Sequence, residues 1–339
     1  MRRFVHLVLI LLSTLSGWTI AVSAAPSKVM SSICITNGTM HKTLNGANDT
    51  IEVPPNWNGR LLLYTHGFIS GGPLQNPGQD APDAVTGGKL LKEGYALAGS
   101  SYSQNGWVAA LAMKETLNLL DYFDKTCGTP QKGTITWGES MGGLVSASLA
   151  HYYSHRFIAA IPMCGVLTIG KGELTIPVLT MHTIGDDFVS VHVEGNYAQV
   201  VKQAGSGVML RQIYVAHNGH CNFTPGNFLS AVHTVVNDAL DHGGKWGNYD
   251  PNKHPDQLNN QASSYGSQYN GQSPNFQTYT AEPTPLNYPT LGVDPSTDDS
   301  TTPSKSPTPH KSPTPHKSPN GSSHSKASKP GSPAHVNIG

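Results

Sequence analysis

Between residues 27 and 245, short runs of β-branched and apolar residues alternate with longer segments of helical periodicity. The apolar runs predict strands at 51–53, 60–65, 95–100, 133–137, 157–162, 177–183 and 208–215. Apolar residues spaced three and four apart predict helices near 81–93, 107–124, 141–154, 192–203 and 226–241. Because strands that alternate with helices are joined by crossover connections, this order predicts an α/β fold with a mostly parallel central sheet flanked by helices.

The pattern changes beyond about residue 246. Residues 246–300 are rich in Asn, Gln, Ser, Tyr and Gly, without sustained apolar periodicity, and are interpreted as a linker or a peripheral segment. Residues 301–339 are rich in Pro, Ser, Thr, Lys and His, and the repeat "KSPTPHKSPTPHKSPN" favours extended polyproline II. We therefore expect a disordered tail. Its five lysines, without an acidic residue, suit contact with an anionic cell wall or polymer surface, and a plain spacer is the alternative.

The chain begins with a basic pair, an apolar run and then Val22-Ser23-Ala24, which is the pattern of a signal peptide over residues 1–24. An uncleaved membrane anchor is the alternative, but serines and a threonine interrupt the apolar run. No other stretch is long and apolar enough to cross a bilayer. We expect a secreted, extracellular protein whose main folded domain covers residues 25–245.

Four cysteines lie in the expected mature chain: Cys34, Cys127, Cys164 and Cys221. An even number in an oxidising compartment predicts two disulfides, and no pair has the spacing of a zinc site. Cys164 closes a predicted strand and Cys221 follows His220 in the loop after another predicted strand, so both are expected at one edge of the sheet. The predicted pairs are Cys164–Cys221 and, by elimination, Cys34–Cys127.

Charge narrows the range of partners. Only 12% of the residues are charged and the formal net charge is zero, so no overall field would attract nucleic acid or an anionic membrane. Small molecules or neutral polymers are the expected partners.

The segment "WGESMGG", residues 137–143, places Ser140 between Gly138 and Gly142. The motif Gly-x-Ser-x-Gly alone is weak. Here a β-branched run, "GTITW", ends directly before it, and a helical pattern, "GGLVSASLAHYY", follows it. Strand, sharp turn and helix form the setting of a nucleophile elbow, in which the glycines tolerate close packing while the serine projects above the sheet.

A serine hydroxyl needs a histidine as base and a carboxylate to orient that histidine. The predicted strands that end near 183 and 215 are followed by "IGDDFVS" and "AHNGHCNFTPG". The acid is therefore Asp186 or Asp187, and we favour Asp186 because it is the first carboxylate past the strand. The base is His217 or His220, and His220 is favoured because Gly219 and the helix that follows place it at the loop apex. The remaining nearby histidines, His66, His182 and His192, are interpreted as structural.

The developing oxyanion also needs hydrogen-bond donors. The backbone N–H of Met141, directly after the serine, is one candidate. The second is the N–H of Phe68, in the "HGF" loop after the strand "LLLYT", where Gly67 permits a turn.

Together, "NWNGRLLLYTHGF", "SSYSQNGW", "WGESMGG", "IPMCGV", "IGDDFVS" and "NGHCNFTP" resemble a secreted α/β-hydrolase of the esterase and polyester (PHB) depolymerase type, over roughly residues 34–245. The resemblance implies the α/β-hydrolase fold and a Ser-His-Asp acyl hydrolase without metal or organic cofactor. These roles map onto Ser140, Asp186 and His220. Tannase-like and feruloyl-esterase-like relatives place cysteines directly before the serine and directly after the histidine. Here Cys221 follows the histidine, but Glu139 precedes the serine.

The expected function is that of a secreted serine hydrolase, a carboxylic-ester hydrolase acting through an acyl-enzyme on small-molecule or polymeric esters. A serine peptidase of the same fold and a non-catalytic binding module are the alternatives. Only residues 165–175 separate the strand after the nucleophile helix from the strand that bears the acid. So short a connection predicts no large lid.

Overall fold

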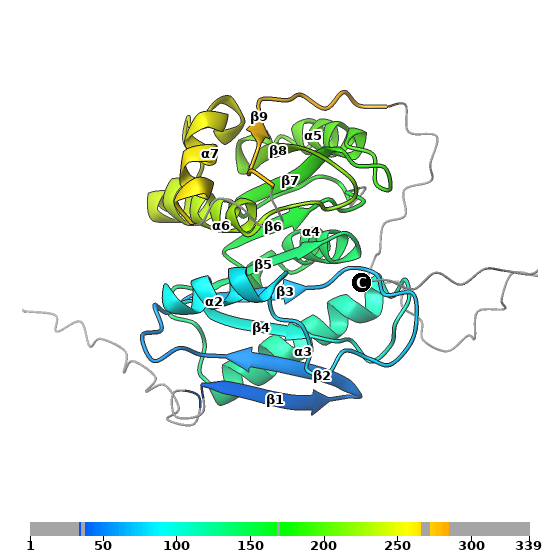
Figure 1. The fold of residues 1–339 in the computed structure, drawn as a ribbon, viewed down its shortest axis with the longest axis vertical. Helices are drawn as coiled ribbons and strands as arrows, with labels where there is room; N and C mark the ends of the chain where they lie inside the picture. Colours follow the sequence, from blue (N-terminus) through cyan, green and yellow to red (C-terminus); the bar gives the residue numbers. More distant parts are fainter. Residues whose placement is uncertain (1–33, 35–37, 168–169, 266–271, 285–339) are drawn as a thin grey trace, which may run out of the picture. The chain divides into compact units, whose positions relative to one another are not determined.

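A nine-stranded open sheet organises the residues that the computed structural model describes, which are 34, 38–167, 170–265 and 272–284 (Figure 1). The strands are β1 (Thr39–Leu44), β2 (Ala47–Glu52), β3 (Leu61–Thr65), β4 (Ala96–Ser100), β5 (Thr134–Glu139), β6 (Ala159–Met163), β7 (Val178–Gly185), β8 (Leu210–Asn218) and β9 (Phe276–Gln277). Their order is β1-β2-β4-β3-β5-β6-β7-β8-β9. The six central strands, from β4 to β8 in this order, are parallel, whereas β1, β2 and β9 pair antiparallel.

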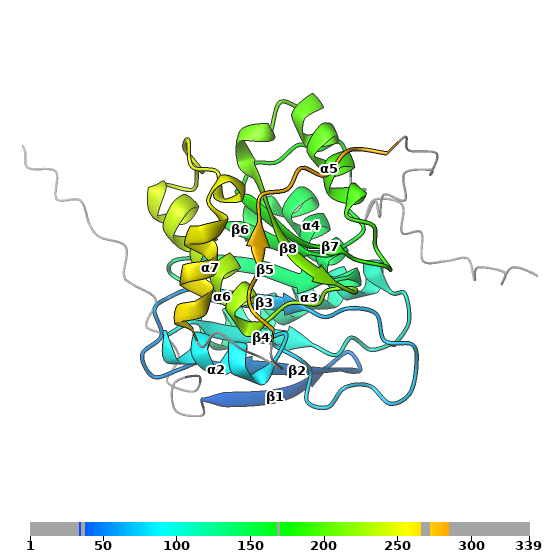
Figure 2. The ribbon, with the colours of Figure 1, turned by 45° about the horizontal axis from the view of Figure 1, so that its top comes forward.

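Helices cover both faces of this sheet. Among the described residues, the flanking α-helices are α2 (Ala84–Lys92), α3 (Ala109–Thr126), α4 (Met141–Tyr152), α5 (His192–Gln203), α6 (Pro225–Thr234) and α7 (Pro255–Ser264). Apolar side chains of α3, α4 and α5 share one buried cluster, and those of α2, α6 and α7 share another. Figure 2 shows α2, α6 and α7 gathered on one face of the sheet. The prediction of an α/β fold with a mostly parallel central sheet flanked by helices is confirmed.

The helix expected at 226–241 changes geometry along its length. Thr224 and Asn227 form a capping box at its start, with the Asn227 Oδ1 accepting from the Thr224 N–H at 2.8 Å. The α-helix ends at Thr234, and a π turn (Val235–Ala239) and a 3₁₀ turn (Leu240–His242) continue the chain. Hence the apolar stripe extends past the α-helix itself.

Strand β1 was not among the predicted elements. Its residues are mostly exposed and polar, so no apolar run marks it. It pairs with β2 across Asn45 and Gly46, whose φ angles are +52° and +92°. An Asn-Gly pair in this conformation favours a tight hairpin, so the turn was the signal that could have located the strand.

Helix α7 and strand β9 lie in the segment 246–300, where no element was expected. Trp246 is 1% exposed, and its indole N–H donates to the carbonyl oxygen of Met209 at 3.0 Å. Leu258 of α7 is buried in the same cluster as α6. Phe276 of β9 pairs with Val215 of β8. Part of this segment therefore packs against the sheet as a peripheral layer.

The predicted signal peptide and tail, residues 1–24 and 301–339, lie outside the described residues. Within the described part of the chain, no helix combines the length and hydropathy needed to span a bilayer. The connection from β6 to β7, residues 164–177, has no helix among its described residues, as expected for a fold without a large lid.

Two disulfides join the cysteines in the pairing expected from the sequence. Cys34 bonds to Cys127 at the C-terminal end of α3, and Cys164 bonds to Cys221 beside the C-terminal ends of β6 and β8. Disulfides are typical of proteins from oxidising compartments.

Candidate active site

Ser140 occupies a strained turn between β5 and α4. Its φ and ψ angles are +56° and −122°, a region that a residue with a Cβ rarely adopts and that costs about 1–3 kcal/mol. The Ser140 N–H donates to the carbonyl oxygen of Met163 on β6 at 2.9 Å, and its carbonyl accepts from Leu144 of α4 at 3.1 Å. These contacts hold the serine at the end of β5, as expected for a nucleophile elbow.

The two glycines of the motif are required by close backbone contact. A Cβ on Gly138 would lie 2.1 Å from the Thr65 Oγ1, and a Cβ on Gly142 would lie 1.9 Å from the Thr65 carbonyl oxygen. The Thr65 hydroxyl donates to the Gly142 carbonyl at 2.7 Å. The elbow therefore packs directly on the end of β3, and a side chain at either position would separate the two.

The structure brings Ser140, His220 and Asp186 into hydrogen-bond contact. The Ser140 Oγ is 2.8 Å from the His220 Nε2, and the His220 Nδ1 is 2.8 Å from the Asp186 Oδ2. Asp186 follows β7 and His220 follows β8, so all three side chains meet at the same edge of the sheet. In this arrangement His220 can accept the serine proton while Asp186 accepts the Nδ1–H.

Asp186 is fixed by several donors. Its Oδ1 accepts from the N–H groups of Phe188 and Val189 at 2.9 and 2.8 Å. Burial acts to raise its pKa, but hydrogen bonds from His182 and His220, together with those two amides, hold the pKa well below its usual range. The carboxylate therefore stays ionised beside the imidazole.

The alternative acid and base do not join this cluster. Asp187 is exposed to solvent. The ring nitrogens of His217 contact the carbonyl oxygens of Asn222 and Ser273, at 2.7 and 2.8 Å, so this histidine connects two backbone segments.

The candidate oxyanion donors lie next to Ser140. Met141 is the first residue of α4, and the first N–H groups of a helix have no partner inside it. The loop that carries Phe68 runs past the serine, since a Cβ on Gly67 would lie 3.2 Å from the Ser140 Cβ. The His66 Nδ1, 2.7 Å from the Gly67 carbonyl oxygen, braces this loop. That these two amides stabilise an oxyanion stays a prediction.

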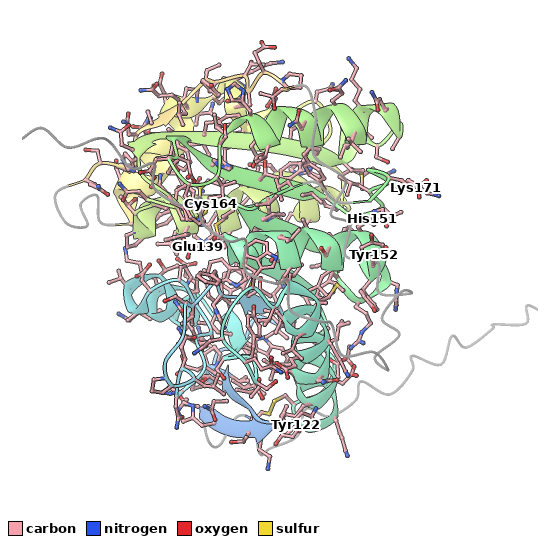
Figure 3. The ribbon with its side chains drawn as sticks, turned by 90° about the vertical axis from the view of Figure 1, so that its right-hand side faces the viewer. Tyr122, Glu139, His151, Tyr152, Cys164 and Lys171 are labelled. Atoms are coloured by element: carbon pink, nitrogen blue, oxygen red, sulfur yellow. A yellow bond between two sulfur atoms is a disulfide. The ribbon has the colours of Figure 1, made fainter. Side chains whose placement is uncertain are left out.

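Glu139 has a distinct place beside the nucleophile. The Tyr64 hydroxyl donates to its Oε2 at 2.8 Å. Burial raises the pKa of Glu139 to about 7. Figure 3 shows Glu139 and Cys164 close together, as the pairing of Glu139 with Met163 requires. In the sequence, Glu139 stands out only because it occupies the position where tannase-like and feruloyl-esterase-like enzymes have a cysteine.

Three exposed aromatic side chains surround this edge of the sheet. Phe68, Trp107 and Phe188 are 46%, 55% and 73% exposed. The Phe188 ring lies 5.1 Å from the His220 ring, between centroids. A β-bridge between Ile69 and Gly106 joins the loops that carry the other two. The sequence alone indicates no role for Trp107 or Phe188, because an apolar residue in a loop does not by itself indicate a site.

The described residues bring together one group of three candidate metal ligands, Cys164, His220 and Cys221. The two sulfur atoms are joined in the disulfide, so neither can bind a metal as a thiolate. The absence of a cofactor stays a prediction.

The Cys164–Cys221 disulfide should support the position of His220. We expect Cys164→Ser/Cys221→Ser to lower the free energy of unfolding by about 4 kcal/mol, because the bond closes a separation of 57 residues. We also expect kcat/KM to fall on the order of 10–100-fold, since small displacements of a catalytic group have effects of this size. Denaturant titration and ester hydrolysis, both at a temperature where the protein is folded, measure the two quantities.

The other disulfide provides the control. Cys34–Cys127 closes a separation of 93 residues and lies at the C-terminal end of α3. The opposite end of α3 is the one near the site, because the Val108 N–H there contacts Met141. Cys34→Ser/Cys127→Ser should lose similar stability and keep its activity per folded molecule. Equal losses of activity in both pairs would contradict a local role for Cys164–Cys221.

Comparisons with known proteins give limited similarity. No family model matches the sequence. A curated o-phthalyl amidase from Xanthobacter agilis is 31% identical over 88 residues, which are 26% of this chain and only 18% of that protein.

Solved structures that resemble the chain are esterases and peptidases. Est1E from Butyrivibrio proteoclasticus is 17% identical, with a TM-score of 0.43, over 59% of this chain and 97% of that one. Esterase 2 from Thermogutta terrifontis, phosphorylated by paraoxon, is 15% identical, with a TM-score of 0.44, over 62% and 96%. Acylaminoacyl peptidase from Pyrococcus horikoshii is 12% identical, with a TM-score of 0.42, over 54% and 37%. Likeness at this level does not assign an activity to this chain.

Proposed function

We propose that the protein is a secreted serine hydrolase that cleaves carboxylic esters through an acyl-enzyme. The hydrogen-bonded row from Ser140 through His220 to Asp186, with Ser140 in a strained elbow, is the observation that carries this proposal. The nucleophile, the base and the orienting carboxylate each have a partner of the required chemistry.

In the proposed reaction, the Ser140 Oγ attacks the ester carbonyl while the His220 Nε2 accepts the serine proton. The amides of Met141 and Phe68 donate to the oxyanion of the tetrahedral intermediate. As the carbon–oxygen bond to the alcohol breaks, His220 donates its proton to the leaving oxygen. Water then attacks the acyl-enzyme, again losing a proton to His220, and the carboxylic acid leaves as Ser140 regains its hydrogen.

The substrate class we propose is a bulky or polymeric ester. The short connection over 164–177 and the exposed side chains of Phe68, Trp107 and Phe188 support this choice. Aromatic side chains exposed beside a reactive serine present an apolar surface to a substrate. Without a substrate, these side chains remain largely in contact with water.

We also propose the processing and layout of the chain. Residues 1–24 would be removed on export, residues 25–245 would hold the catalytic machinery, and residues 301–339 would keep the enzyme near a cell wall or polymer surface. A tail of this kind raises the effective concentration of the enzyme at that surface.

The test combines labelling with a substrate panel. A fluorophosphonate should form one adduct, on Ser140, as mapped by mass spectrometry. Short-chain and long-chain p-nitrophenyl esters, a p-nitroanilide and a polyester film should then be compared, with and without residues 301–339. We expect turnover of the esters and release from the film, with film release falling when the tail is removed.

Each outcome has a distinct meaning. An adduct on another residue would contradict the assignment of Ser140. Faster turnover of the p-nitroanilide than of the matched ester would indicate a peptidase or amidase. Ester turnover without any release from the film would limit the substrate to small soluble esters.

A further inference from the structure

A second buried histidine lies directly behind Asp186. His182, on β7, and Glu194, in the first turn of α5, are both 0% exposed. The His182 Nε2 is 2.9 Å from the Val189 carbonyl oxygen and 3.5 Å from the Asp186 Oδ2. Its Nδ1 is 3.1 Å from the Glu194 Oε1. Five side chains therefore form one continuous row: Ser140, His220, Asp186, His182 and Glu194.

The hydrogen-bond partners of His182 and Glu194 determine which of their atoms carry hydrogen. A carbonyl oxygen only accepts hydrogen bonds, so the His182 Nε2 carries a hydrogen toward Val189. The Glu194 Oε2 accepts from the Thr180 hydroxyl and from the Gln212 Nε2, the latter at 2.6 Å. Two donors at one oxygen favour the ionised carboxylate. The His182 Nδ1 then donates to Glu194 as well, and the ring is a cation.

The electrostatic surroundings agree with a charged ring. Burial acts to lower the pKa of His182, but its hydrogen bonds to Asp186 and Glu194 raise the pKa to about 9. Tyr197 of α5 and Tyr214 of β8 also face Glu194, and burial raises the pKa of both phenols, so they remain neutral.

Two further carboxyl groups belong to the loops and strand ends that form the site. Glu139, at the end of β5, faces His220, and burial raises the pKa of its carboxyl to about 7. Asp187, in the loop after β7, points into solvent, where water screens its charge. Neither group contacts His182 in the described hydrogen bonds and ion pairs, so Glu194 and Asp186 are its charged partners.

We propose that His182 and Glu194 are positioning residues for the hydrolysis, a buried imidazolium–carboxylate pair that keeps Asp186 ionised and oriented toward the His220 Nδ1. This inference rests on the proposed function. The positive charge behind Asp186 offsets part of the negative charge that Asp186 presents to His220. Removing the pair therefore changes the charge that His220 faces through its hydrogen bond to Asp186.

The variant that tests this is the double substitution His182→Gln/Glu194→Gln. It removes the ion pair without leaving an unpaired buried charge, which either single substitution would do. The measured quantities are the rate at which a fluorophosphonate labels Ser140 and the kcat/KM for p-nitrophenyl acetate, both as functions of pH. We expect the acid limb of both profiles to move to higher pH, on the order of one unit.

His217→Gln is the matched control, because His217 lies near the end of β8, the strand that His220 follows, but contacts backbone carbonyls rather than Asp186. Its acid limb should stay at the wild-type pH. An unchanged acid limb in a double variant that keeps the wild-type melting temperature would overturn the inference.

If the double variant does not fold, nitrogen NMR of the wild-type protein can measure the protonation of the His182 ring directly. We expect both ring nitrogens of His182 to carry hydrogen at pH 7, and a neutral ring would overturn the inference. Failure of Ser140 to react with the fluorophosphonate in wild type would count against the proposed function instead, and the NMR result would still decide the charge of His182.

Discussion

Replacing Ser140 with alanine should reduce ester hydrolysis on the order of 10⁶-fold, and Asp186→Asn should reduce it on the order of 10⁴-fold. Without the Oγ there is no acyl-enzyme. With asparagine at position 186, the side chain can donate as well as accept, so the His220 tautomer with hydrogen on Nδ1 loses its charged acceptor at 2.8 Å. The kcat for a p-nitrophenyl ester, measured on folded protein, checks both values.

Asp187→Asn is the matched control for the acid. It makes the same chemical change one residue away, on a side chain that faces solvent. We expect kcat within about a factor of three of wild type, since exposed charges have small effects. Comparable losses at positions 186 and 187 would mean that Asp186 is not the residue that orients His220.

The positions of the three candidate residues could largely be predicted from the chain because each of them follows a strand end. Ser140, Asp186 and His220 each follow a strand of parallel sheet, and such ends meet at one edge. The sequence alone left Asp187 and His217 open. Only the geometry of the loops distinguishes each of them from the favoured residue. Asp187, one position after Asp186, points into solvent, and His217, three positions before His220, contacts backbone carbonyls.

The role proposed for His182 and Glu194 could not be predicted in this way. Neither residue stands at a strand end, and a histidine inside an apolar strand is usually a buried structural residue. The significance of His182 depends on Glu194 in α5 and Gln212 in β8, which meet it only after the strands and helices pack. No spacing along the chain encodes that meeting.

The peripheral segment was missed for a different reason. Helix α7 and strand β9 bury only a few apolar side chains, Leu258, Ala262 and Phe276, and asparagine side chains supply the rest of their attachment. The Asn227 Nδ2 donates to the Pro274 carbonyl at 2.8 Å, and Asn259 exchanges two hydrogen bonds with the backbone of Phe276, at 2.9 and 2.7 Å. Asparagine-rich sequence usually indicates a loop, because its amide satisfies backbone groups outside regular structure. Here the same property attaches a segment to the sheet.

Gly142→Ala should destabilise the protein severely, although alanine is normally the better residue inside a helix. The new Cβ would lie 1.9 Å from the Thr65 carbonyl oxygen and 2.8 Å from that of His66. Both atoms belong to backbone at the end of β3, which cannot rotate away as a side chain can. We expect the free energy of unfolding to fall by about 3 kcal/mol or more, as for severe overpacking.

Gly88→Ala is the matched control, because Gly88 also lies inside a helix, α2, but a Cβ there would meet no atom within 4 Å. This variant should gain up to about 1 kcal/mol from the higher helix propensity of alanine. Denaturant titration of both variants measures the two changes. If Gly142→Ala were as stable as wild type, β3 and α4 could not be in the direct backbone contact that holds Ser140 above the sheet.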